Sequence, residues 1–271
     1  MAGLVYGGDC IAKDGVYVSA EIGVNWLGKW NILEQMVDEA AYAGADAVKL
    51  QMFCSEEVKG HPAYDLLKKM VLSAYDVETI CERAHKKNMD VVVTPMNPSA
   101  VDMLKDTKID GVKIRAKDWL RSEIVEPAMA LGKPTYISVP YENGVIKKPG
   151  DVSDGDFHRG FMRTRARDTY HVMCIPKYPP ALEDLTLYVS SQVDGFSNHY
   201  PDWTIPLMAG YGKMAHDALR PSSVRRRFYL EVHVMPVVSP FHDVLDKDVS
   251  IDFSDLKKLV TALNNGERAV G

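Results

Sequence analysis

Residues 16–53 read VYVSAEIGVNWLGKWNILEQMVDEAAYAGADAVKLQMF, and this stretch decides the fold. Two apolar runs, VYVSAEIGV and DAVKLQMF, flank a segment of helical periodicity that stops at Gly44, a typical helix C-terminal residue. Such a strand–helix–strand unit predicts two parallel strands joined by a crossover helix. Polar groups stand toward the far end of each run: Glu21 on the first, and Lys49 and Gln51 on the second. Because α/β barrels build their active sites at the carboxyl ends of their strands, the stretch also predicts where the chemistry lies.

The alternation of strand and helix continues along the chain. Strands are expected at 16–21, 46–51, 90–94, 110–114, 134–138, 170–174, 193–197 and 228–233. Helices are expected at 31–43, 75–87, 98–106, 119–131, 183–191, 203–217 and 253–265. This pattern predicts an α/β protein with a parallel (β/α)8 TIM barrel, formed as a single domain over residues 1–271. Residues 1–15, with two glycine-containing turns, are expected to form a β-hairpin that caps the lower end of the barrel.

Two segments fit this alternation poorly. Residues 54–74 form a long insertion between a strand and a helix. Residues 141–168 contain Gly, Pro and many charges where the fifth helix belongs. Both a helix around 156–166 and a long loop near the site stay open for that segment.

Composition and charge narrow the class of protein. The net charge of −5 and the scattered basic residues give no reason to expect binding to nucleic acid. The four cysteines show no CxxC pairing and are interpreted as reduced thiols of a cytosolic protein. No signal peptide is visible at the N-terminus, and no apolar run approaches the ~20 residues of a membrane span. We therefore expect a cytoplasmic protein without nucleic-acid or membrane partners.

Polar side chains recur at the carboxyl ends of all the expected strands. In strand order they are Glu21; Lys49 and Gln51; Thr94; Lys113 and Arg115; Ser138; Lys177 and Tyr178; Ser197 and His199; and Glu231 and His233. Residues two apart in a strand share a face, so the pairs that can point into the barrel together are Lys49 with Gln51, Ser197 with His199, and Glu231 with His233. Unpaired charges inside a core are costly. The recurrence therefore favours a catalytic mouth over a structural polar core.

His199 and His233 stand at the ends of neighbouring expected strands, where their imidazoles could reach one divalent metal ion. Imidazole suits zinc, copper, iron and nickel, so these ligands alone leave the metal open. With only two protein ligands, the ion would keep positions for water and substrate oxygens.

Lys49 and Lys113 would form a cationic pocket with Ser138 and Ser197, suited to a phosphate or a carboxylate. Salt bridges from the two lysines to the glutamates of the first and last strands are an alternative. The two interpretations do not exclude each other.

The sequence resembles the sialic acid synthase family over nearly the whole chain. The matching segments are AEIGVN, GADAVKLQ, DVVVTPM, GVKIRAKD, GKPTYIS, MCIPKYPP, GFSNHY and YLEVHV. The resemblance implies a barrel enzyme that condenses phosphoenolpyruvate with an amino sugar. It also implies a divalent metal, usually manganese, held by His199 and His233. This metal would activate the aldehyde of the open-chain sugar for attack by C3 of phosphoenolpyruvate.

The resemblance further implies roles for the other residues at the mouth. Glu21 matches a glutamate that positions water for attack at C2, and Gln51, Glu231 and Asp246 match positions that contact sugar or metal-bound water. The phosphate and carboxylate of phosphoenolpyruvate would lie against Lys49, Thr94, Lys113, Ser138, Tyr178 and Ser197.

The chain departs from the family pattern within the site. Asn25-Trp26-Leu27-Gly28 replaces an asparagine–histidine–asparagine–glycine run, and Arg115-Ala116 replaces an alanine–serine pair. Arg115 or Lys117 would then replace the lost phosphate contact. The chain stops at Gly271, so we expect the barrel without the family's C-terminal antifreeze-like domain. A homodimer, in which a partner chain supplies what that domain would have, stays open.

Three functions follow from these observations. The leading hypothesis is a metal-dependent synthase that adds phosphoenolpyruvate, or a related carboxylated nucleophile, to an aldehyde or amino sugar. The second is a metal-dependent aldolase or lyase of specialised metabolism that does not use phosphoenolpyruvate, which the altered phosphate contacts favour. The third is a non-catalytic binding protein, and the retention of both histidines and both glutamates argues against it.

Overall fold

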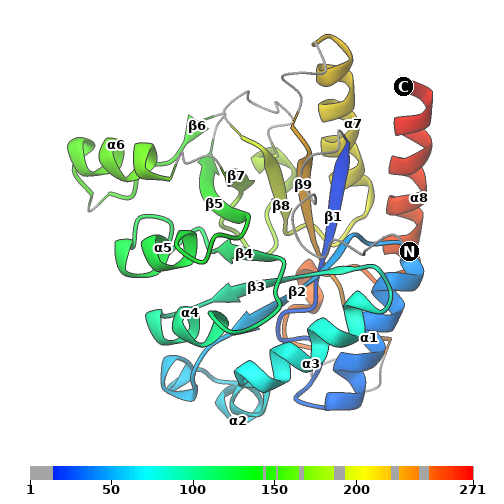
Figure 1. Ribbon diagram of the computed structural model, residues 1–271. Helices are drawn as coiled ribbons and strands as arrows, with labels where there is room; N and C mark the ends of the chain where they lie inside the picture. Colours follow the sequence, from blue (N-terminus) through cyan, green and yellow to red (C-terminus); the bar gives the residue numbers. More distant parts are fainter. Residues whose placement is uncertain are drawn as a thin grey trace, which may run out of the picture.

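Eight parallel strands close into a barrel in the computed structural model, which describes residues 15–142, 145–150, 152–164, 168–185, 193–220, 226–237 and 244–270 (Figure 1). The strands are β1 (Val16–Glu21), β2 (Ala47–Met52), β3 (Asp90–Pro95), β4 (Gly111–Ile114), β5 (Thr135–Glu142), β7 (Thr169–Cys174), β8 (Gly195–Asn198) and β9 (Phe228–His233). Their order is β4-β3-β2-β1-β9-β8-β7-β5, and a further pairing of β4 with β5 closes the ring. The prediction of a parallel α/β barrel is confirmed, whereas the hairpin predicted over 1–15 lies outside the described residues except for Gly15.

Helices surround the barrel and cover the apolar outer faces of its strands (Figure 1). They are α1 (Trp30–Ala43), α2 (Tyr64–Leu67), α3 (Ala74–His85), α4 (Pro98–Leu104), α5 (Ser122–Met129), α6 (Asp154–Arg163), α7 (Thr204–Ala218) and α8 (Phe253–Val270). The last of them, α8, packs against α1 and α7, so the end of the described chain closes the helical ring beside its beginning.

In three segments the structure adds elements that the sequence did not predict. The insertion 54–74 contains α2 and two 3-10 turns, η1 (Ser55–Val58) and η2 (Lys68–Met70). In the described part of 141–168, a short strand, β6 (Val145–Ile146), pairs antiparallel with the end of β5 and precedes α6, so a helix is present there. Where a helix was expected at 183–191, the 3-10 turn η3 (Leu182–Asp184) overlaps its start, and 186–191 lie outside the described residues.

The start of α5 shows why helix boundaries were misplaced. The expected helix began at 119, but α5 begins at Ser122. The buried carboxylate of Asp118 accepts hydrogen bonds from Arg115 Nε at 2.5 Å and from Arg121 Nη1 at 3.1 Å. These two bonds hold the preceding residues in consecutive turns, which delays the helix.

Four tyrosines fill the interior of the barrel near the amino ends of the strands. Tyr17, Tyr136, Tyr170 and Tyr229 are buried, and the rings of Tyr136 and Tyr229 stack with centroids 3.9 Å apart. The guanidinium groups of Arg226 and Arg227 lie over the rings of Tyr170 and Tyr17, at 4.3 and 4.7 Å from the ring centroids. We call these four residues the tyrosine floor, because Glu21, Ser138 and Glu231 follow them on β1, β5 and β9 toward the carboxyl ends of the strands.

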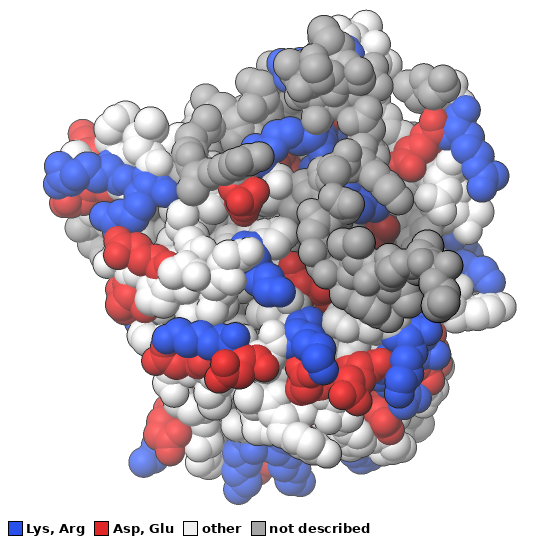
Figure 2. Space-filling model, viewed as in Figure 1, with Lys and Arg blue, Asp and Glu red and all other residues white. Residues whose placement is uncertain are grey.

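Charges of both signs are interspersed on the face of the molecule shown in Figure 2. Among the ion pairs of the described residues, Arg83 pairs with Glu34 at 2.9 Å and with Asp38 at 2.7 Å. None of the helices in the described part of the chain is long and apolar enough to cross a membrane.

The main chains of β8 and β9 approach so closely at Gly195 that a side chain does not fit. A Cβ on Gly195 would lie 2.3 Å from the carbonyl oxygen of Tyr229 and 3.0 Å from its Cβ. We expect Gly195→Ala to lower the free energy of unfolding by at least about 2 kcal/mol in urea, because β9 would have to move. Gly150→Ala is the control, since a Cβ there meets nothing within 4 Å, and it should change the free energy by less than about 0.5 kcal/mol. Equal effects of the two substitutions would contradict this account.

Candidate functional site

Two lysines and two glutamates form a buried ion-pair network above the tyrosine floor. Lys49 Nζ lies 2.9 Å from Glu21 Oε2 and 3.6 Å from Glu231 Oε1. Lys113 Nζ lies 3.0 Å from Glu231 Oε2, and none of the four side chains is more than 5% exposed. They come from β1, β2, β4 and β9 and meet because alternate residues of each strand face the barrel interior. The salt bridges that the sequence left open are present, and their formal charges cancel.

Hydroxyl groups complete the hydrogen bonding of this network. Ser197 Oγ donates to Glu231 Oε1 at 2.7 Å, and the Tyr229 hydroxyl donates to Glu231 Oε2 at 3.2 Å. The lysines donate to two further hydroxyls, Lys49 to Thr94 Oγ1 at 3.1 Å and Lys113 to Ser138 Oγ at 2.7 Å. The structure thus brings together most of the residues predicted to bind phosphate, and it leaves neither lysine without a carboxylate partner.

Burial shifts the pKa values of the lysines and of Glu231, and the neighbouring charges oppose these shifts to different extents. Burial raises the pKa of Glu231, but the charges of Lys113 and Lys49 outweigh it and hold that pKa well below its usual range. Burial lowers the pKa of Lys49, but Glu21 and Glu231 more than offset this and raise it. For Lys113 burial dominates, so its pKa is lowered despite Glu231. Lys113 is therefore the member of the network that gives up its proton more readily than an ordinary lysine.

His199 and His233 face each other at the mouth of the barrel, above the network. Their ring centroids are 5.3 Å apart and the ring planes meet at 62°. His199 Nδ1 lies 3.0 Å from the carbonyl oxygen of Ile175, which can only accept, so Nδ1 carries the proton and Nε2 keeps its lone pair. Burial, with the neighbouring His233, lowers the pKa of His199 to about 3. The ring is therefore neutral near pH 7, which is the form that binds metals.

Three polar side chains converge beside His233. Gln51 Nε2 donates to Glu21 Oε1 at 2.6 Å, and Asp246 Oδ2 lies 3.6 Å from His233 Nδ1. Gly23 has a φ of +51°, and a Cβ there would lie 2.9, 3.0 and 3.5 Å from Glu21 Oε1, Gln51 Nε2 and Asp246 Oδ2. The absence of a side chain at Gly23 leaves these three groups room to meet at the mouth.

A divalent cation suits the donors at this mouth. His199 Nδ1 faces the carbonyl oxygen of Ile175, and His233 Nδ1 faces Asp246 Oδ2 at 3.6 Å, so the Nε2 atom of each ring is left to bind an ion. In the part of the chain that the structure describes, no cluster of three or more His, Cys, Asp or Glu side chains could hold a metal ion. An ion bound by the two imidazoles would therefore complete its coordination with water or substrate oxygens.

The remaining predicted residues lie at the rim of the mouth. The Tyr178 ring packs on His199, with centroids 4.0 Å apart. Arg115 Nε bonds to Asp118 as described, and its Nη2 donates to the carbonyl oxygen of Met96 at 3.3 Å. Lys177 does not join the network, because it is half exposed and pairs with Asp184.

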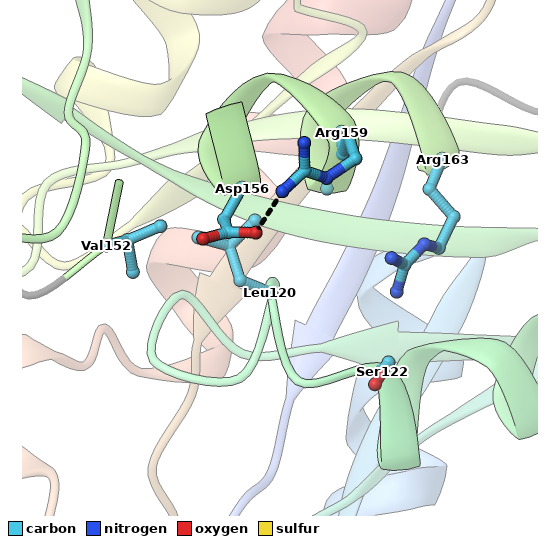
Figure 3. A pocket seen from close by; sticks show the side chains of 7 residues that line it. Leu120, Ser122, Val152, Asp156, Arg159 and Arg163 are labelled. Atoms are coloured by element: carbon cyan, nitrogen blue, oxygen red, sulfur yellow. Dashed lines mark hydrogen bonds and ion pairs between the residues drawn. The ribbon is translucent and has the colours of Figure 1, made fainter. Parts of the chain in front are cut away.

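A separate cavity of about 300 Å³ lies outside the barrel, between the start of α5 and α6 (Figure 3). It is lined by Leu120, Ser122, Val152, Asp156, Arg159, Gly160 and Arg163. Arg159 bonds to Asp156 at 2.5 Å within it, and Arg163 pairs with Glu126 at 2.9 Å. Both arginines have carboxylate partners, and the lining contains no histidine, so the barrel mouth with its two facing imidazoles is the better candidate site.

Comparison with known proteins agrees with this architecture. The model of the NeuB family matches residues 36–212, which include β2 to β8. The chain belongs to the NeuB family. The resemblance to sialic acid synthases inferred from the sequence is thereby confirmed.

Individual relatives of this NeuB-family chain include named synthases. It is 25% identical over 261 residues to an uncharacterized protein of Methanocaldococcus jannaschii, covering 94% of this chain and 72% of that protein. It is 23% identical over 281 residues to the pseudaminic acid synthase of Campylobacter jejuni, covering 94% and 75%. The crystal structure of N-acetylneuraminic acid synthetase from Leptospira borgpetersenii in complex with citrate matches with a TM-score of 0.75 at 25% identity, covering 95% of this chain and 86% of that one.

Sequence reasoning missed two residues of this candidate site. Tyr229 lies two residues before Glu231 on the same strand face, so the period of two could have revealed it. Asn25 was noted only as part of a divergent run, yet its buried amide contacts the main chain at Asp246. No local pattern signals that contact, because the two residues are far apart in sequence.

Proposed function

We propose that this NeuB-family protein is a divalent-metal-dependent synthase, which joins C3 of phosphoenolpyruvate, or of a related carboxylated nucleophile, to the aldehyde carbon of an open-chain amino sugar. The observation that carries the proposal is the pair of facing imidazoles directly above a buried Glu–Lys network. The names of two relatives, a pseudaminic acid synthase and an N-acetylneuraminic acid synthetase, support this class of reaction.

The proposed reaction balances with water as the third reactant. A carbon–carbon bond forms between C3 and the aldehyde carbon, water adds at C2, and phosphate leaves. His199 and His233 would hold the metal, for which we propose manganese, and a bound ion supplies a Lewis acid for the aldehyde oxygen. Glu21 would hold the water that adds at C2. Its Oε1 accepts a hydrogen bond from Gln51 Nε2 at 2.6 Å, which orients the carboxylate. Glu231 keeps Lys49 and Lys113 in place beneath the reacting carbons.

Arg115 is paired with Asp118 as the lysines are with the glutamates, but its guanidinium has five N–H donors, and the bonds to Asp118 and Met96 engage only those on Nε and Nη2. Phosphoenolpyruvate carries a phosphate and a carboxylate, and the charges of Lys49 and Lys113 are already balanced by glutamates. Arg115 is only 24% exposed and is held by Asp118, so its guanidinium is oriented before any ligand arrives. We therefore propose that Arg115 binds the phosphate.

Removal of this guanidinium should weaken phosphoenolpyruvate binding. A hydrogen bond to a charged group is worth about 1.5–3 kcal/mol, so Arg115→Ala should raise the KM for phosphoenolpyruvate by about tenfold or more in steady-state kinetics. Arg121→Ala is the matched control, because Arg121 pairs with the same Asp118 and is 45% exposed. We expect it to change KM by less than about threefold, since surface ion pairs contribute little. An unchanged KM in Arg115→Ala would remove Arg115 from the site.

Phosphate release tests the proposed function directly. The protein is incubated with Mn²⁺, phosphoenolpyruvate and a panel of aldehyde sugars that carry acetamido groups, and free phosphate and the keto-acid product are measured. We expect one phosphate for each keto acid formed, and no phosphate when the aldehyde is left out. If no aldehyde in the panel releases phosphate from a metal-loaded protein, the use of phosphoenolpyruvate is contradicted.

The neutral network favours a second candidate function. Because each lysine has a carboxylate partner, the barrel floor offers no net positive charge to a phosphate group. A metal-dependent aldolase or lyase that acts on a carboxylated keto acid needs less positive charge there. It would cleave a hydroxy keto acid into pyruvate and an aldehyde without releasing phosphate, so pyruvate formation from such acids separates the two candidates.

A further inference from the structure

Asn25 is a fully buried side chain beneath the mouth, and its amide makes three hydrogen bonds. It follows β1, close to Gly23, and is 0% exposed. Its Nδ2 donates to the carbonyl oxygen of Val234 at 2.8 Å and to Ser250 Oγ at 3.0 Å. Its Oδ1 accepts from the main-chain N–H of Asp246 at 3.0 Å. One side chain therefore ties three segments of the chain together.

Ser250 completes a clamp around Asp246. The Ser250 hydroxyl donates to the carbonyl oxygen of Asp246 at 2.7 Å. Both main-chain polar atoms of Asp246 are thus held by side chains, the N–H by Asn25 and the carbonyl by Ser250. Asp246 precedes the 3-10 turn η6 (Lys247–Val249) and makes no capping bond with its own side chain. The carbonyl also accepts the main-chain N–H of Val249 at 3.1 Å, so the clamp adds to the turn in fixing the position of Asp246.

The same clamp reaches the strand that carries His233. Val234, whose carbonyl accepts from Asn25, directly follows His233 at the end of β9. The main chain of Ile251, next to Ser250, donates to the carbonyl oxygen of His233 at 2.9 Å. Asn25 is therefore bonded to the main chain on both sides of the 3.6 Å contact between His233 Nδ1 and Asp246 Oδ2.

We propose that Asn25 is a positioning residue, which together with Ser250 fixes the carboxylate of Asp246 against the His233 ring and thereby sets the affinity of the mouth for its divalent metal. This inference rests on the metal centre of the proposed function. Groups that orient a metal-binding histidine typically change metal affinity by about 10–100-fold when they are altered. Asn25 and Ser250 would therefore change the metal affinity through the position of Asp246, without contacting the ion themselves.

Mn²⁺ binding without substrate tests the proposal, because it does not depend on turnover. Free Mn²⁺ is titrated into wild type, Asn25→Ala and Ser250→Ala, and its electron paramagnetic resonance signal gives the Kd. We expect Asn25→Ala to weaken binding by about tenfold or more, and Ser250→Ala to weaken it by a smaller factor. Thr169→Val is the control, since it removes a buried hydrogen bond of 2.6 Å to Thr164 far from the mouth. It should lose stability and keep the wild-type Kd.

The outcomes separate this inference from the proposed function. If wild type binds Mn²⁺ and folded Asn25→Ala and Ser250→Ala bind it equally well, the positioning role is overturned and the metal centre stands. If Asn25→Ala does not fold, Ser250→Ala decides by the same measurement. If wild type binds no Mn²⁺, the proposed metal centre is contradicted, and the proposed effect of Asn25 on metal affinity is contradicted with it. Hydrogen exchange at the Asp246 amide then tests the clamp itself: about tenfold faster exchange in the variants supports it, and unchanged exchange overturns it too.

Discussion

Replacing His199 or His233 by alanine is expected to abolish Mn²⁺ binding and to lower turnover by at least about a thousandfold. The two rings are the only facing imidazoles that the described residues place at the mouth, with centroids 5.3 Å apart. Loss of one ring leaves a single nitrogen donor, which cannot hold a divalent ion against water. Because Lewis-acid activation is worth several kcal/mol, and each 1.36 kcal/mol is tenfold in rate, the aldehyde would react far more slowly. Metal titration and steady-state phosphate release measure the two effects.

The control for these variants is a buried histidine outside the mouth. His171 lies on β7, is 3% exposed and has its Nε2 2.8 Å from Thr164 Oγ1. His171→Gln should lower the melting temperature while leaving Mn²⁺ affinity unchanged. Wild-type Mn²⁺ affinity in either His199→Ala or His233→Ala would show that these rings are not the ligands.

Glu231→Gln is expected to have the largest effect on stability. Glu231 is the carboxylate shared by the two lysines, and it accepts hydrogen bonds from Ser197 and Tyr229. Neutralising it would leave Lys113 buried without a counter-charge and Lys49 with Glu21 alone. Removal of one partner of a buried ion pair typically costs about 3–5 kcal/mol, so urea unfolding should show a loss of that size. Activity should also fall, because the lysines would no longer be held beneath the reacting carbons.

Two further variants test the electrostatic origin of this loss. Glu126→Gln removes an exposed carboxylate that pairs with Arg163 at 2.9 Å, and it should cost less than about 1 kcal/mol. In the double variant Glu231→Gln, Lys113→Met the network again has equal numbers of lysines and carboxylates, so part of the lost stability should return. A double variant that is as unstable as the sum of both single variants would argue for packing instead of charge.

The barrel could be predicted because its signals are local. Apolar residues recur with a period of two in strands and of 3.6 in helices, and each period can be recognised within a single segment. Once the strands are located, the polar residues at their carboxyl ends can be located too. The helix boundaries could not be predicted in the same way. The late start of α5 depends on one carboxylate, Asp118, and the extension of β5 to Glu142 depends on its pairing with β6.

The membership of the site was easier to predict than its electrostatics. The sequence places Glu21, Lys49, Lys113 and Glu231 at the strand ends of the barrel, yet only the structure shows which oxygen each lysine contacts. This pairing decides whether the charges of the lysines are free or are balanced by glutamates. The pairing depends in turn on the stagger between neighbouring strands. Asn25 was missed for a related reason, because its partners lie more than two hundred residues away.

The tyrosine floor determines the route by which molecules would come and go. Tyr17, Tyr136, Tyr170 and Tyr229 fill the barrel beneath Lys49 and Lys113, so a ligand would reach the lysines only through the histidine-lined opening. A molecule seated on the lysines would be trapped while a second one occupies the opening. Under the proposed function, an approach from one end would impose an order: the reactant nearer the lysines would arrive first, and what remains of it would depart last.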